Sequence, residues 1–307
     1  MTALSTSFRR IRSGHDVESL VALLRDLPVS GVELEYRIPA PVRPMLQDAL
    51  RQAGIRVVSV HNFFPLPDEF LKTGGSGDLF SLADIRREER QEAVKRTLAT
   101  IDRAHDLEAR AVVLHCGRVE MASEVGTVYD RLRQSATAST EPPQWLQARL
   151  AERDRRKPAH LDALRFSLEK LLPAADRREL LLGLETRFHF YELPGPEDFR
   201  PLLQEFDGAP LGYWHDTGHA AANEQLGLVA EGRLLEELAD RLIGIHLHDA
   251  IGLEDHLPPG DGQIDFKALA ARLRPGVLQV LELHPGTSPE DVRKGLAYWA
   301  SCLRSTS

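Results

Sequence analysis

Short apolar runs alternate with longer amphipathic stretches along the whole chain. The runs are rich in β-branched residues, which favour strands, and the stretches between them have the length and periodicity of helices. Seven runs have this character: residues 31–36, 55–61, 109–115, 179–185, 210–216, 242–248 and 277–282. This alternation predicts βα units and a parallel sheet.

A weaker run near the beginning, "ALSTSFRRI" at 3–11, supplies an eighth candidate strand. Eight parallel strands with intervening helices close into a ring, so we predict a TIM (β/α)8 barrel of the α/β class. The last helix is expected over 288–304, where Ser288 and Asp291 have capping-box spacing and Pro289 lies in the first turn. Its apolar face consists of Val292, Leu296, Trp299 and Leu303.

Two connections, near 62–87 and 117–160, are too long for simple turns. The first contains "KTGGSGD", and the second contains "QSATASTEPPQ" followed by the charged "AERDRRK". Loops of this length are usually functional, and loops that follow barrel strands lie on the active face. We expect residues 1–307 to form a single barrel with both loops on that face. The "AERDRRK" segment is interpreted as a solvated helix face in preference to a phosphate-binding patch.

Composition narrows the function classes. The 307 residues are 42% hydrophobic, and 38 Lys and Arg against 46 Asp and Glu give a net charge of −8. This charge balance argues against a broad surface that binds nucleic acid and favours a small substrate. It does not exclude a local basic groove. The sequence has no membrane-length apolar run and no apolar segment typical of a signal peptide, so we expect a cytoplasmic protein. Cys116 and Cys302 have no CxxC spacing, which fits a reducing compartment.

Ionisable residues stand at or near the ends of six predicted strands. They are His61, His115, Glu185, Asp216, His246 and Glu282. A parallel barrel brings the carboxyl ends of its strands to one rim, so these side chains are expected to converge. Clustered carboxylates and imidazoles must be paired or must coordinate a cation. The sequence therefore predicts a divalent metal site.

The residue types limit the metal. Carboxylates and imidazoles without thiolates favour Mn²⁺ or Zn²⁺, with Co²⁺, Fe²⁺ or Mg²⁺ as alternatives. His246 and His248 share a face of one strand, and we assign His246 as the ligand because "LHD" after it resembles the exit from a strand. His248 is expected to support a ligand, and His215 is interpreted as structural.

The chain resembles the xylose-isomerase-like TIM barrels, which include sugar isomerases and epimerases and the zinc-dependent apurinic-site endonucleases. The resemblance covers nearly the whole chain. It rests on five motifs in order: "GLE" ending at Glu185, "DTGH" at 216–219, "IHLHD" at 245–249, "DHLPPGDGQIDF" at 255–266 and "LELH" at 281–284.

The resemblance to the epimerases implies one divalent ion held by Glu185, Asp216, His246 and Glu282. In such enzymes the two glutamates exchange a proton with carbon through an enediolate, so Glu185 and Glu282 are also the expected catalytic residues. We further expect substrate contacts from His219, Arg187, His189 and Trp214.

The resemblance to the endonucleases implies a larger site. His61 and His115 match two further zinc ligands, and His219 and His256 match ligands of a third ion. The acidic partner of that third ion is Glu254 here, with Asp255 as a substitute, which departs from the Asp-x-His pattern of the endonucleases.

Three functions follow as alternatives. The leading one is metal-dependent isomerisation or epimerisation of a sugar, a sugar phosphate or a related acid. The second is metal-dependent phosphodiester hydrolysis, including cleavage of abasic DNA, and the third is a sugar-binding barrel without catalysis. The expected partner is a small carbohydrate. Binding to nucleic acid is disfavoured but stays an alternative, and no association with a membrane is expected.

Overall fold

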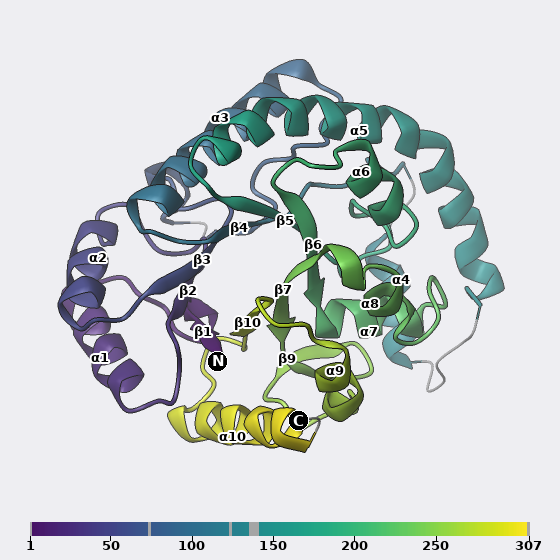
Figure 1. Cartoon of the computed structure of the whole chain (residues 1–307). Coiled ribbons are helices and arrows are strands. Elements are labelled where there is room, and N and C mark those ends of the chain that lie inside the picture. Colours follow the sequence, from purple (N-terminus) through teal and green to yellow (C-terminus); the bar gives the residue numbers. More distant parts are fainter. Residues whose placement is uncertain (1, 73–74, 123–124, 135–140, 306–307) are drawn as a thin grey trace.

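Eight parallel strands close into a barrel in a computed structural model that describes residues 2–72, 75–122, 125–134 and 141–305. Around the ring the strand order is β1-β10-β7-β6-β5-β4-β3-β2 (Figure 1). The barrel strands are β1 (Ala3–Ser5), β2 (Val32–Leu34), β3 (Val57–His61), β4 (Ala111–Leu114), β5 (Leu181–Glu185), β6 (Leu211–Asp216), β7 (Leu242–Leu247) and β10 (Leu278–Leu281). The predicted TIM barrel is confirmed.

Helices surround the barrel (Figure 1). They are α1 (Gly14–Arg25), α2 (Arg43–Gln52), α3 (Arg87–Asp106), α4 (Gly126–Gln134), α5 (Gln144–Asp176), α6 (Phe199–Glu205), α7 (Thr217–Gln225), α8 (Arg233–Glu237), α9 (Phe266–Arg272) and α10 (Pro289–Ser305). Short 3₁₀ turns η1 (Thr6–Phe8), η2 (Asp68–Phe70) and η3 (Ala239–Arg241) join some of these elements. The predicted last helix corresponds to α10, and Ser288 accepts a hydrogen bond from the Asp291 backbone as predicted.

The weak eighth strand closes the ring. Ala3 pairs with Val280 of β10, and Leu4 pairs with Val32 of β2, so β1 joins strands from both ends of the chain. The residues that follow reinforce this seam, because the Ser7 hydroxyl donates to the Leu283 carbonyl at 3.0 Å. A short strand of three residues is therefore sufficient when both of its edges are paired.

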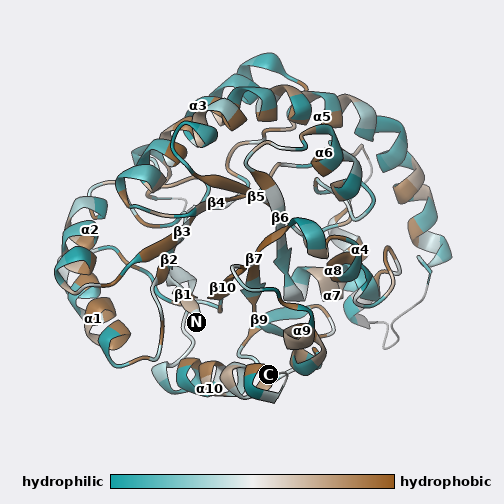
Figure 2. Ribbon diagram, in the orientation of Figure 1, coloured by the Kyte–Doolittle hydropathy of each residue, from teal (hydrophilic) through white to brown (hydrophobic). Residues whose placement is uncertain are grey.

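A tryptophan fills the barrel interior. Trp214 is fully buried, and a side-chain carbon at Gly183 or Gly244 of the neighbouring strands would collide with its ring. Small apolar residues from other strands complete the packing around it. Figure 2 shows the same division at larger scale, with hydrophobic strands at the centre and hydrophilic faces on the outer helices.

Residues 117–160 were predicted to form a long loop, but much of this segment is helical. It contains α4 and the first half of α5, and residues 135–140 of its "QSATASTEPPQ" stretch lie outside the described residues. The "AERDRRK" stretch at 151–157 is helical, but its Arg153 is buried and forms a 2.6 Å ion pair with Glu197. This part of the helix is thus anchored to the chain after β5 instead of being wholly solvated.

The connection 62–87 contains η2 and otherwise irregular backbone, and residues 73–74 of "KTGGSGD" lie outside the described residues. An antiparallel hairpin that the sequence did not predict follows β7. It consists of β8 (Asp249–Ile251) and β9 (Glu254–Leu257). Both segments lie beyond the carboxyl ends of barrel strands, where the candidate site is located.

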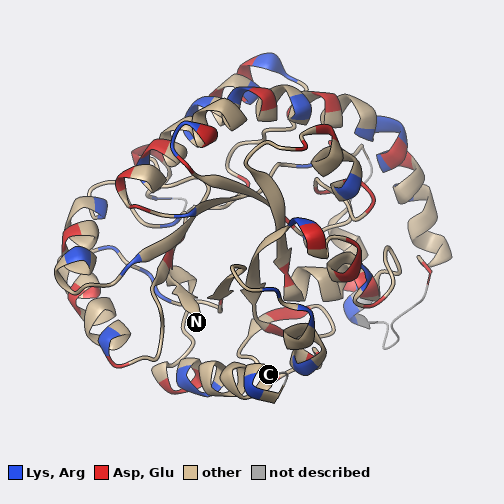
Figure 3. Ribbon diagram, viewed as in Figure 1, with Lys and Arg blue, Asp and Glu red and all other residues tan. Residues whose placement is uncertain are grey.

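Charged residues of both signs are interspersed along the outer helices (Figure 3). The barrel strands carry few of them in the same view. Within the described ranges, no helix combines the length and apolar character required to cross a membrane.

Candidate metal centre

The six predicted strand-end residues converge at the carboxyl rim of the barrel. His61, Glu185 and Asp216 end β3, β5 and β6, and His246 is the penultimate residue of β7. His115 and Glu282 directly follow β4 and β10. Asp216 and His246 are register partners on adjacent strands. Parallel strands of similar length therefore deliver these side chains to one layer.

The central group consists of Glu185, Asp216, His246 and Glu282, all buried, with ligand atoms within 4.8 Å of one another. The Nδ1 atom of His246 is its focus. It lies 2.8 Å from Glu185 Oε1, 2.9 Å from Glu282 Oε2 and 3.6 Å from Asp216 Oδ2.

A second group shares Glu185 with the first. The other oxygen of this carboxylate, Oε2, lies 2.8 Å from His115 Nε2 and 3.2 Å from His61 Nε2. These ligand atoms also lie within 4.8 Å of one another. Glu185 therefore bridges two adjoining groups with its two oxygens.

A third group consists of His219, Asp255 and His256. Asp255 takes the acidic position, whereas Glu254 is exposed and belongs to none of the groups found among the described residues. Successive residues of a strand face opposite sides, so Glu254 and Asp255 diverge. His256 has a left-handed φ of 55°, which breaks this alternation and lets it serve the same group as Asp255.

Glu33 of β2 was missed in the sequence. Its carboxylate oxygens lie 3.1 and 3.2 Å from His246 Nε2, and the Ser59 hydroxyl donates to Oε2 at 2.7 Å. The signal was present in "GVELEY", because Glu33 and Glu35 interrupt a predicted strand with charge and both are buried. The same alternation of apolar and charged residues is also typical of a strand with one solvated face, so the sequence does not distinguish the two cases.

Asp78 was also missed, because it belongs to the long connection after β3. Its Oδ2 lies 2.9 Å from Arg187 Nη2 and 3.4 Å from His115 Nδ1. Arg187 is buried and also pairs with Glu192 at 3.1 Å. The connection therefore closes over the second group, while the Nε and Nη1 atoms of Arg187 lack a hydrogen-bond partner among the described residues.

Other residues that were singled out in the sequence lie outside the three groups. Trp214 was expected to contact substrate, but it lies in the barrel interior, with its ring 5.2 Å from His246. His189 is partly exposed and pairs with Glu192 at 3.2 Å. His248 contacts Asp216 at 2.9 Å and lies outside the three groups, as expected for a supporting residue.

Histidine orientation fits the binding of divalent cations. The Nδ1–H groups of His61 and His219 donate to the carbonyls of Asn62 and Thr186, both at 2.9 Å. This arrangement leaves an unprotonated Nε2 toward the acidic groups, and ligating histidines are usually held in this way by their second nitrogen. Buried carboxylates and imidazoles without thiolates are suitable donors for Mn²⁺ or Zn²⁺.

Electrostatics keep the carboxylates ionised. Burial opposes ionisation of Glu185, but the charges of His115 and His246 hold its pKa well below the usual range. Burial acts on Asp216 in the same direction, and His219 and His248 overcome it so that its pKa is also well below normal. The ring of ionised oxygens therefore produces a negative field that attracts cations.

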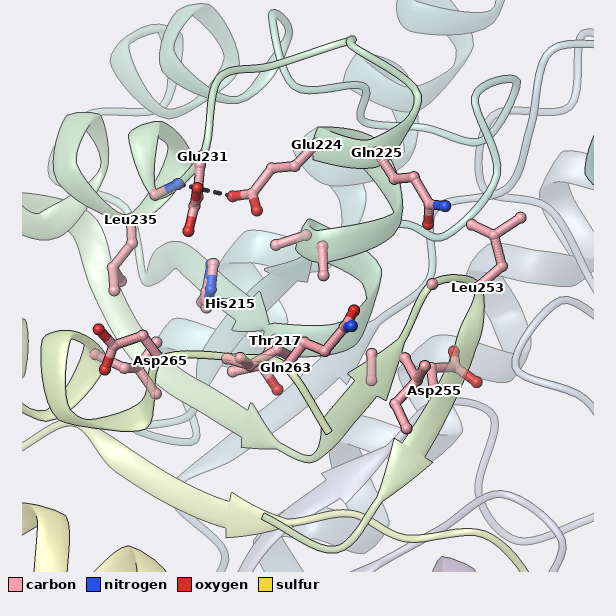
Figure 4. A pocket seen from close by; sticks show the side chains of 18 of the residues that line it. His215, Thr217, Glu224, Gln225, Glu231, Leu235, Leu253, Asp255, Gln263 and Asp265 are labelled. Carbon is pink, nitrogen blue, oxygen red and sulfur yellow. Dashed lines mark hydrogen bonds between the residues drawn. The ribbon is translucent and has the colours of Figure 1, made fainter. Parts of the chain in front are cut away.

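A cavity of about 1470 Å³ lies outside the barrel wall, between α7, α8, α9 and the β8–β9 hairpin (Figure 4). His215 faces it, and the ring of this residue bonds to the Tyr213 hydroxyl at 2.7 Å. Glu224 and Glu231 also line the cavity (Figure 4). Among the residues of the metal groups, Asp255 reaches its edge.

The chain belongs to the xylose isomerase-like TIM barrel family, whose model matches residues 21–302. A 71-residue segment is 37% identical to the uncharacterized protein y4fM of Sinorhizobium fredii. That match covers 22% of this chain and spans about a fifth of the length of the relative, 21%.

Solved structures share the fold over nearly the full chain. The 3-keto-D-glucoside 4-epimerase of E. coli has a TM-score of 0.67 at 16% identity, covering 98% of this chain and 99% of its own. A putative xylose isomerase of Rhodospirillum rubrum has a TM-score of 0.68 at 18% identity, covering 100% and 99%. A D-tagatose 3-epimerase-like protein has a TM-score of 0.66 at 19% identity, covering 99% and 97%. At these identities the likeness establishes the fold.

Proposed function

We propose that this chain is a divalent-metal-dependent sugar isomerase or epimerase that transfers a proton through an enediolate. The observation that carries the proposal is the central group, where two buried, ionised glutamates, Glu185 and Glu282, approach the same atom of His246. The solved structures of similar fold are named as epimerases acting on sugars and as a putative xylose isomerase, which supports the same reaction class.

A bound divalent cation, with Mn²⁺ or Zn²⁺ as first candidates, supplies Lewis-acid polarisation of a substrate carbonyl. Glu185, Asp216, His246 and Glu282 would hold it. One of the two glutamates takes a proton from the carbon beside the carbonyl, and the other returns a proton, so that the configuration or the carbonyl position changes.

Other residues bind and orient the sugar. The Nε and Nη1 atoms of Arg187 have no hydrogen-bond partner among the described residues, and Nδ1 of His219 lies 3.5 Å from Oδ1 of Asp216 in the central group. We assign both to substrate hydroxyl or carbonyl oxygens. The connection that carries Asp78 restricts water above His115, because Gly77 packs against the imidazole ring. Restricting water protects a reactive enediolate from side reactions.

Phosphodiester hydrolysis is a second candidate, favoured by one specific observation. Glu185 belongs to two of the three groups, and the third contacts the central group through His219 and Asp216 at 3.5 Å and through His256 and Glu282 at 4.0 Å. Several divalent cations held side by side can supply both activation of water and stabilisation of the leaving oxygen. In this reading His61, His115, His219 and His256 bind ions, whereas the isomerase requires the central group alone.

Deuterium exchange separates the two reactions. In deuterated water with Mn²⁺, a panel of aldoses, ketoses and their phosphates should include one that gains deuterium beside its carbonyl. Glu282→Gln should abolish the exchange while retaining part of the metal, because glutamine keeps one ligating oxygen but cannot accept the proton. Glu236→Gln, an exposed change on α8, is the matched control and should exchange like the wild type.

The contrary result is equally specific. If no sugar exchanges, while a simple phosphodiester or an abasic duplex is cleaved in a metal-dependent way that requires His61 and His115, the isomerase assignment is wrong.

A further inference from the structure

Glu33 is a buried carboxylate in a barrel strand that supplies no residue to the three groups. Its side chain is fully buried in β2, which is separated from β7 by β1 and β10 in the ring. The contact with His246 therefore crosses the barrel interior. Both carboxylate oxygens lie near the same nitrogen, at 3.1 and 3.2 Å from Nε2.

The surroundings of Glu33 give this carboxylate no other function. Among the described residues, its side chain bonds to the Ser59 hydroxyl and to His246, and no arginine or lysine pairs with it. Burying a carboxylate without a cationic partner is costly. By contrast, the neighbouring Glu35 forms a 2.7 Å ion pair with Arg37 and is accounted for by that pair.

The orientation of His246 is the reverse of that of other rim histidines. His61 and His219 are held through Nδ1 by backbone carbonyls, which leaves Nε2 toward the acidic groups. His246 instead directs Nδ1 to Glu185 and Glu282, so its Nε2 is the nitrogen that must be held. No backbone carbonyl in the described part of the chain bonds to this nitrogen, and Glu33 is the acceptor in its place.

We propose that Glu33 is a positioning residue that accepts the Nε2–H of His246 and thereby fixes the tautomer in which Nδ1 binds the cation. Ser59 in turn orients Glu33. Glu33 is not itself a ligand, because its oxygens face the nitrogen opposite to the one that meets the central group. The inference rests on the metal binding in the proposed function but requires no particular substrate.

The test measures metal affinity and histidine geometry together. Glu33→Gln should lower the affinity for Co²⁺ by about 10- to 100-fold, which is the usual effect of mutating a residue that holds a metal-binding histidine. The visible absorption spectrum of the bound Co²⁺ should change, because the glutamine amide can present either its oxygen or its NH₂ group to Nε2 and no longer specifies one tautomer of His246. In protein labelled with ¹⁵N-histidine and loaded with Zn²⁺, the wild type should have His246 protonated at Nε2 and metal-bound at Nδ1.

Two variants control for general damage. Glu35→Gln removes an equally buried carboxylate two residues away that does not contact His246, so its Co²⁺ affinity and spectrum should match the wild type. Ser59→Ala keeps Glu33 but removes its hydrogen-bond donor, so it should weaken Co²⁺ binding less than Glu33→Gln. If Glu33→Gln does not fold, Ser59→Ala decides: a lower affinity at unchanged melting temperature supports the inference, and an unchanged affinity overturns it.

The remaining outcomes distinguish this inference from the proposed function. A folded Glu33→Gln protein with wild-type affinity and spectrum overturns the positioning role alone, as does a wild-type His246 that is metal-bound at Nε2. A wild-type protein that binds no Co²⁺ overturns both. Weakened binding in Glu33→Gln, together with no exchange into any sugar, supports the inference and removes the isomerase.

Discussion

Each rim side chain depends on contacts that lie outside its own strand. His61 shows the simple case, in which the next residue of the chain, Asn62, provides the acceptor for the ring. His246 shows the difficult one, in which the acceptor comes from a strand more than two hundred residues away. The sequence revealed the ligands because a charge that ends an apolar run is conspicuous. It concealed Glu33 because a charge within a strand looks like a solvated face.

A residue away from the metal groups gives a pH-dependent prediction. Burial raises the pKa of Glu224 to about 7, the charge of Glu231 adds to this effect, and a hydrogen bond from the Gly232 N–H opposes it. The folded protein therefore holds this proton more tightly than the unfolded chain. The contribution of Glu224 to the free energy of unfolding is fully present below the unfolded pKa of about 4.5. It is lost as the pH rises through the folded pKa of about 7.

Glu224→Gln should remove this loss. We expect the variant to be more stable than the wild type at pH 8, by about 1 kcal/mol once partial exposure of the side chain is allowed for, and to show no advantage at pH 4. Urea unfolding at both pH values measures the difference, with Glu236→Gln on the exposed face of α8 as control. Equal stability gains at both pH values would contradict the assigned cause.

At the scale of elements, the apolar runs were reliable because each barrel strand is buried on both faces. Seven of eight strands were clear for this reason, and β1 was weak because polar residues follow it at once. The long helix α5 was obscured by Pro158 and Pro173, which usually interrupt helices. The β8–β9 hairpin had no such pattern, and its register decides between Glu254 and Asp255.

Strand packing beneath the site is a testable property of β7. Gly244→Ala places a methyl group against the ring of Trp214, which is fully buried. Overpacking of this kind should lower the free energy of unfolding by about 1–3 kcal/mol, measurable by denaturant titration. Gly126→Ala is the matched control, because no described atom lies within 4 Å of the new carbon and alanine favours the helix. An unaffected Gly244→Ala protein would show that the interior can repack.

The whole rim, taken together, predicts the number of ions. If the three groups all bind, zinc-saturated protein should contain up to three ions per chain by elemental analysis. His61→Ala and His256→Ala should each remove about one, because each belongs to a different group. His105→Ala, on the exposed surface of α3, should remove none. A single ion at every zinc concentration would leave the central group as the whole site and favour the isomerase.

More of the fold than of the candidate site could be predicted, because barrel closure fixes the strands but not the connections between them. Once eight runs are counted, the strand ends must meet at one rim, and six residues distant in sequence are brought together. What the count does not determine is the path of the connections. Asp78 and Asp255 come from a loop and a hairpin, and their positions depend on contacts that no periodic pattern records.

The β1–β10 seam also has a consequence for how the molecule is made. Residues 3 and 4 pair with residues 280 and 281, so this edge of β1 stays unpaired in a growing chain until β10, the last barrel strand, has emerged from the ribosome. Such edges can pair with other chains. Completion of the barrel is therefore a late step, and until then the open sheet presents an unpaired edge to other chains.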